Sequence, residues 1–119
     1  MNEPFETNAT RFPTYAVVAV SGELDAYTAP KLRECTQSLV GDGVERLVLD
    51  LRGVTFLDST GLGALVGIKK RLSSGDKTMC LVVEDSQPVR RVFENTRVDK
   101  ALPIHQTVEA AVHDCAGAS

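Results

Sequence analysis

Runs of apolar residues at strand length mark where the chain is expected to form a sheet. Residues 15–20 are rich in β-branched side chains and lead into Ser21 and Gly22, which predicts a strand followed by a turn. Residues 46–51 are almost continuously apolar, a pattern typical of a strand covered on both faces. Residues 78–83 predict a third strand, and residues 101–104 predict a short strand at the edge of the sheet.

Segments with helical spacing of apolar residues lie between these strands. Thr28 is expected to cap a helix that ends at the glycines of residues 41–43. A second helix is predicted over residues 61–74, a short third helix after Pro88, and a last helix capped by Thr107.

The alternation of strands and helices predicts one α/β domain. We expect a mainly parallel or mixed sheet of four to five strands, flanked by about four helices. The length of 119 residues is enough for one compact core. Residues 1–14 are polar and carry two prolines, so they are expected to form an N-terminal edge segment. Residues 15–116 are expected to form the domain, and residues 117–119 a frayed tail.

The charge balance of the chain is acidic. Thirteen Lys and Arg residues stand against sixteen Asp and Glu residues, a formal net charge of -3, whereas nucleic-acid binding needs a basic surface. No apolar stretch approaches the roughly 20 residues that cross a bilayer, and residues 1–4 lack the basic and apolar regions of a secretory leader. We therefore expect no direct nucleic-acid or membrane partner, and a cytoplasmic location.

The cysteines and histidines have no metal-binding spacing. Cys35, Cys80 and Cys115 are odd in number, far apart and set among apolar neighbours, which predicts reduced, buried thiols. His105 and His113 lie eight residues apart without a cysteine pair or a zinc-protease pattern, so both are expected at the surface or at a sheet edge. The sequence thus predicts neither a metal site nor a cofactor.

Polar residues 58–63 follow a predicted strand and open a predicted helix. This is where open α/β sheets display functional groups, and free N–H groups at a helix start favour an anion or another acceptor. The simplest interpretation is that Asp58 or Ser59 only caps the helix. The segment lacks a phosphate-binding loop motif, so a nucleotide-binding protein is a weaker hypothesis. It also lacks the G-x-S-x-G elbow of serine hydrolases, so a small hydrolase with Ser59 as nucleophile is a weaker hypothesis too.

The predicted helix over residues 61–74 has an apolar stripe and a second, less usual face. On a helical wheel one arc is expected to face the core, formed by Ala64, Leu65, Ile68 and Leu72. Leu62 and Val66 lie outside this arc, beside two glycines, Gly63 and Gly67. Each glycine costs about 1 kcal/mol of helix stability relative to Ala. Either another element of the domain packs closely over this face, or a partner protein does.

Three segments of the chain together resemble a known family. They are Gly22-Glu23-Leu24-Asp25 with Thr28-Ala29-Pro30, then Leu47-Val48-Leu49-Asp50-Leu51, then Phe56-Leu57-Asp58-Ser59-Thr60-Gly61-Leu62-Gly63. They are similar to the STAS-domain anti-sigma factor antagonists of bacteria. The resemblance covers residues 15–112, and Asp-Ser-Thr-Gly-Leu-Gly is its most specific part.

This resemblance implies a binding module without catalysis of its own. It implies that the unphosphorylated protein binds an anti-sigma factor with serine kinase activity, and that this binding frees a sigma factor. Phosphorylation of Ser59 would dissociate the complex, and a serine phosphatase would restore the unphosphorylated protein. An accessory or scaffold subunit of another complex is the alternative, because sulfate-transporter domains and lipid-transport proteins resemble the same fold.

The resemblance also assigns roles to individual residues. Ser59 would accept the phosphate, and the partner-binding surface would be formed by Asp25, Asp58, Ser59, Thr60, Gly61, Leu62, Gly63 and Val66. For Asp25 a second interpretation carries equal weight, because an Asp three residues before Thr28 can simply stabilise a turn.

Overall fold

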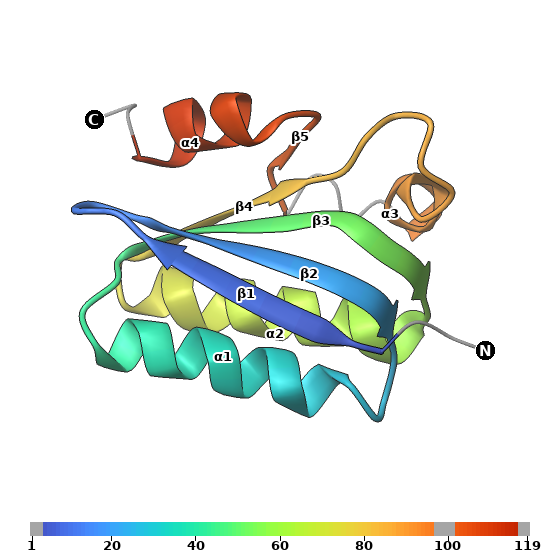
Figure 1. Ribbon diagram of the computed structural model, residues 1–119, viewed down its shortest axis with the longest axis horizontal. Helices are drawn as coiled ribbons and strands as arrows, with labels where there is room; N and C mark the ends of the chain where they lie inside the picture. Colours follow the sequence, from blue (N-terminus) through green and yellow to red (C-terminus); the bar gives the residue numbers. More distant parts are fainter. Residues whose placement is uncertain (1–3, 97–101, 117–119) are drawn as a thin grey trace.

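A computed structural model describes residues 4–96 and 102–116. Its elements are β1 (Glu6–Arg11), β2 (Ala16–Leu24), α1 (Ala29–Gly41), β3 (Arg46–Leu57), α2 (Ser59–Ser74), β4 (Thr78–Val82), α3 (Arg90–Thr96), β5 (Ile104–His105) and α4 (Val108–Ala116). The five strands form one sheet in chain order (Figure 1); β1 runs antiparallel to β2, and the other pairs are parallel. The predicted α/β fold with a mixed sheet is confirmed. The predicted tail, residues 117–119, lies outside the described residues.

The helices cover the sheet from both sides. Figure 1 shows α1 and α2 on one face and α4 on the other. Because side chains alternate along a strand, Leu47 and Leu49 of β3 join the core beneath α1 and α2, while Val48 joins a smaller core beneath α4. The almost continuous apolar run of β3 is therefore explained by burial on both faces.

The two central strands are longer than the sequence predicts. The predicted turn at Ser21 and Gly22 is wrong, since β2 continues through both residues to Leu24. Gly22 has a positive φ of 94° and lies at a register irregularity between β2 and β3, where glycine is the residue that tolerates this backbone. The strand predicted at residues 46–51 is likewise longer, since β3 continues to Leu57.

The remaining elements form close to their predicted positions. Thr107 caps α4, because its Oγ1 accepts a hydrogen bond of 3.1 Å from Ala110 N. The short α3 begins two residues after Pro88. The predicted edge strand at residues 101–104 is replaced by the two-residue strand β5; residue 101 lies outside the described residues.

Candidate functional site

The ends of β2 and β3 place two polar loops side by side. Leu24 pairs with Leu57, so both strands end at the same edge of the sheet. Gly61, in the first turn of α2, packs so closely on the loop after β2 that an added Cβ would lie 2.3 Å from Leu24 O. This contact requires glycine at residue 61. It brings the turn that contains Asp25 next to the start of α2.

Asp58 is the N-cap of α2, as one interpretation of the sequence predicts. Its backbone is extended, and its carboxylate accepts a hydrogen bond of 2.8 Å from Gly61 N. Ser59 and Thr60 follow as the first two helical residues, and both are exposed. Within residues 4–96 and 102–116, neither hydroxyl forms a hydrogen bond. Both are therefore free to meet another protein.

Asp25 organises the turn between β2 and α1. Its carboxylate accepts hydrogen bonds from Tyr27 N at 2.9 Å and from Thr28 N at 3.1 Å. The Thr28 hydroxyl accepts a hydrogen bond from Asp25 N and donates one to Glu23 O at 2.7 Å. Thr28 is the N-cap residue of α1, as predicted, but its side chain makes no capping hydrogen bond because the turn already occupies the hydroxyl. The turn-stabilising interpretation of Asp25 is confirmed.

One face of α2 carries almost no side chains. Ser59, Gly63 and Gly67 follow one another at i, i+4 and i+8, so they lie on one line along the helix, and all three are exposed. A Cβ added at Gly63 or Gly67 would have no atom within 4 Å. Of the two alternatives for this face, packing by another element of the domain is therefore wrong for the described part of the chain. We call Ser59, Gly63 and Gly67 the glycine face.

Leu62 belongs to the core. The stripe predicted for α2 is confirmed, since Ala64, Leu65, Ile68 and Leu72 are buried. Leu62 was expected outside this stripe but is only 7% exposed. Leu62 belongs to the same core cluster as the stripe, so the buried face of α2 is wider than the wheel predicts. Val66 is half-buried and packs against the same core at the border of the exposed surface.

Two exposed aromatic residues flank the loops and were not identified as site residues from the sequence. Tyr27, in the Asp25 turn, is 88% exposed. Phe56, two residues before Asp58, pairs with Glu23 and is 45% exposed. Their exposure is a property of the folded chain, because an aromatic residue in or next to a predicted strand is normally expected to be buried. Exposed aromatic rings are frequent anchors of protein interfaces.

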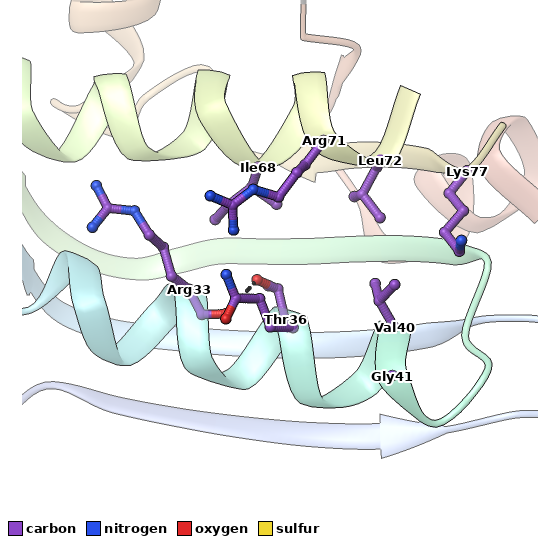
Figure 2. Close-up of a pocket in the computed structure, with 9 residues that line it drawn as sticks. Arg33, Thr36, Val40, Gly41, Ile68, Arg71, Leu72 and Lys77 are labelled. Carbon is purple, nitrogen blue, oxygen red and sulfur yellow. Dashed lines mark hydrogen bonds between the residues drawn. The ribbon is translucent and has the colours of Figure 1, made fainter. Parts of the chain in front are cut away.

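A separate hollow lies between α1 and the second half of α2 (Figure 2). Its volume is about 280 Å³; apolar groups line it at Val40, Ile68 and Leu72, and the side chains of Arg33, Arg71 and Lys77 surround them. It shares no lining residue with the glycine face. We therefore do not include it in the candidate site.

Two of the three cysteines are buried as expected, and Cys35 is half-buried against the core. Cys80 and Cys115 lie in the small core under α4. The hydrogen bond with the Cys115 thiol and burial raise the pKa of Cys80 above its ordinary value. His113 is exposed, and His105 lies on the edge strand β5, as predicted.

Comparison with known proteins places the chain in a family. The STAS domain matches residues 6–111. An anti-sigma-B factor antagonist of Staphylococcus aureus (strain NCTC 8325 / PS 47) is 35% identical over 109 residues, which cover 92% of this chain and 98% of that protein. The crystal structure of an anti-sigma factor antagonist from Mycobacterium paratuberculosis has a TM-score of 0.83 at 31% identity and covers 94% of each chain.

The phosphorylated form of the Bacillus cell fate determinant SpoIIAA shares the fold, with a TM-score of 0.65 at 20% identity over 93% of this chain and 98% of that chain. The chain belongs to the STAS-domain family of anti-sigma factor antagonists. Its relatives are named for a regulatory interaction and not for a catalytic activity. In the described part of this chain, no helix has the length and apolar character needed to span a bilayer.

Proposed function

We propose that this protein is an anti-sigma factor antagonist controlled by phosphorylation of Ser59. In its unphosphorylated form it binds, in the cytoplasm, an anti-sigma factor that is also a serine kinase, and a sigma factor is released. The kinase transfers a phosphoryl group to Ser59, and the complex dissociates. A serine phosphatase then restores the binding form. The observation that carries this proposal is the exposed Ser59 hydroxyl at the end of the glycine face.

The position of Ser59 fits a phosphate that leaves the fold intact. Ser59 is the first residue of α2, where the helix dipole stabilises negative charge and the first N–H groups have no partner within the helix. The Asp58 carboxylate uses Gly61 N, so the N–H groups of the two preceding residues stay available to a phosphate. The charge of about -1.5 to -2 is thus placed at a tolerant site, and we expect the phosphorylated domain to remain folded.

The same charge is unfavourable in a complex. Asp58 and the Asp25 turn lie beside Ser59, so a phosphate there adds a dianion to a surface that already carries two carboxylates. A partner shaped for a hydroxyl would have to desolvate this dianion without a matching positive group. A loss of about 4 kcal/mol lowers the affinity about a thousandfold.

The surface around Ser59 suits a close-packed partner. The glycine face lets another backbone approach α2 closely. Tyr27 in the Asp25 turn and Phe56 near the end of β3 offer exposed rings. Among the residues assigned by family resemblance, Gly61 and Leu62 act differently: they hold the loop and the first turn of α2 in place. We include Asp25, Asp58, Ser59, Thr60, Gly63 and Val66 in the docking surface.

Phosphorylation mapping tests the proposal. The purified protein is incubated with radiolabelled ATP and candidate anti-sigma kinases from the same organism, and the modified residue is located by fragmentation mass spectrometry. We expect one phosphate on Ser59, none on Ser59→Ala, and wild-type labelling of Thr60→Ala. Ser73→Ala, at an exposed serine near the other end of α2, is the matched control and should be labelled like wild type.

The structure leaves Ser59 and Thr60 equally exposed, so the choice of Ser59 rests on the family motif and on chemistry. A serine hydroxyl is less hindered than that of a β-branched threonine, whose χ1 is restricted. Phosphate on Thr60 of the wild-type protein, or continued labelling of Ser59→Ala, would contradict the proposal.

A further inference from the structure

Three metal-ligating side chains meet on the α4 side of the sheet, away from the face that α2 covers. They are Cys80 of β4, His105 of β5 and Asp114 of α4, and their ligand atoms all lie within 4.8 Å of one another. His105 Nε2 lies 3.0 Å from Asp114 Oδ2, and Cys80 Sγ lies 3.9 Å from the same oxygen. Three separate elements therefore converge on one point.

The spacing of these atoms is close to that of a tetrahedral zinc site. With ordinary zinc bond lengths, ligand atoms at tetrahedral corners are about 3.4 Å apart for a nitrogen and an oxygen, and about 3.6 Å apart for a sulfur and an oxygen. The distances of 3.0 Å and 3.9 Å differ from these values by a few tenths of an ångström. The third pair, Cys80 Sγ and a His105 ring nitrogen, lies within 4.8 Å, whereas an ion bound to both would hold them about 3.6 Å apart.

The donor set selects the metal. One thiolate, one imidazole and one carboxylate suit Zn²⁺, whereas Mg²⁺ and Ca²⁺ prefer oxygen ligands alone. Cys80 is buried and fixes the inner side of the site, while Asp114 is exposed and gives an ion a path from solvent. The neighbouring Cys115 Sγ contacts Thr78 Oγ1 at 3.2 Å and Leu47 O at 3.7 Å and is also a hydrogen-bond partner of the Cys80 thiol. It lies outside the cluster of Cys80, His105 and Asp114, so it is not counted as a ligand.

We propose that Cys80, His105 and Asp114 bind one zinc ion, with water as the fourth ligand. The ion would join β4, β5 and α4, which are also held together by the pairing of β4 with β5, by the small apolar core and by the His105–Asp114 hydrogen bond. The site is separate from the Ser59 surface and does not depend on its role. Sequence spacing gave no sign of it, because the three ligands come from three different elements.

Titration of the purified, reduced protein with the metal alone tests the site. We expect one equivalent of Zn²⁺ to bind in competition with a chromophoric chelator. Co²⁺ should give the visible bands of a tetrahedral ion and a thiolate charge-transfer band. A hundredfold excess of zinc over its Kd should raise the Tm by about 11 °C.

Variants of His105 and Asp114, the two ligands that are not buried, test zinc binding without disturbing the core. His105→Gln and Asp114→Asn should each weaken zinc binding at least tenfold while the circular dichroism spectrum stays unchanged, and Cys80→Ser should abolish the charge-transfer band. His113→Gln and Cys35→Ser, on residues outside the site, should bind zinc like wild type. Wild-type affinity in both His105→Gln and Asp114→Asn, or no tetrahedral cobalt spectrum in the wild-type protein, would overturn the proposal.

Discussion

Replacing single glycines of α2 by alanine distinguishes Gly61, which the fold requires, from Gly63 and Gly67, which we expect a partner to contact. In Gly61→Ala the new Cβ would lie 2.3 Å from Leu24 O, about 1 Å short of the 3.4 Å at which ordinary contact begins. Backbone lies on both sides of this contact, so we expect strain of about 3 kcal/mol, at the upper end of overpacking costs. Better helix propensity returns up to about 1 kcal/mol, which leaves a net loss of about 2 kcal/mol.

Gly63→Ala should have the opposite effect on stability. Its Cβ meets no atom within 4 Å, so only helix propensity changes, and the free energy of unfolding should rise by up to about 1 kcal/mol. Gly67→Ala should behave in the same way. At about 4 °C per kcal/mol, the Tm should fall by about 8 °C in Gly61→Ala and rise by up to about 4 °C in each of the other two variants.

Urea and thermal unfolding followed by circular dichroism measure these changes in stability. Calorimetric titration with the anti-sigma partner measures the affinity of each variant. Gly63→Ala should bind about tenfold more weakly despite its higher stability, because a methyl group now stands on the glycine face. Gly41→Ala, at an open glycine of α1, is the matched control and should bind normally. A Gly61→Ala protein as stable as wild type, or full affinity in both Gly63→Ala and Gly67→Ala, would refute the reasoning.

Three further predictions concern the core and the caps. Leu62→Ala should lose about 2–4 kcal/mol in urea unfolding, since the side chain is buried; a change below about 0.5 kcal/mol would place it at the surface instead. Asp58→Ala should lose about 1 kcal/mol by the same assay because the cap of α2 disappears, and an unchanged midpoint would argue against the cap. In native protein, thiol reagents should modify Cys80 and Cys115 slowly and in denaturant quickly, because both are buried; rapid native modification of either would contradict this.

Much of the fold follows from local patterns in the sequence. The apolar run of β3, the stripe of α2 and the cap at Thr107 each reflect a preference that acts within a few residues, and each is found where the pattern predicts it. The errors arose where distant parts of the chain decide the outcome. Ser21 and Gly22 resemble a turn locally, but pairing with β3 keeps both residues inside a strand.

In the candidate site, too, local features could be predicted and features that depend on distant parts of the chain could not. The cap at Asp58 was predicted correctly because strand, cap and helix follow directly along the chain. The burial of Leu62 depends on the main core, which strands distant in sequence help to form. The exposure of Tyr27 and the meeting of Cys80, His105 and Asp114 also depend on tertiary packing, so no local pattern could indicate them.

The affinity of the Ser59-phosphorylated protein for its anti-sigma partner tests the central claim most directly. Protein phosphorylated stoichiometrically on Ser59, verified by intact mass and by a native circular dichroism spectrum, is titrated beside the unphosphorylated protein at the same ionic strength. We expect the phosphorylated form to bind about a thousandfold more weakly while remaining folded. Equal, tight binding by both forms would contradict it.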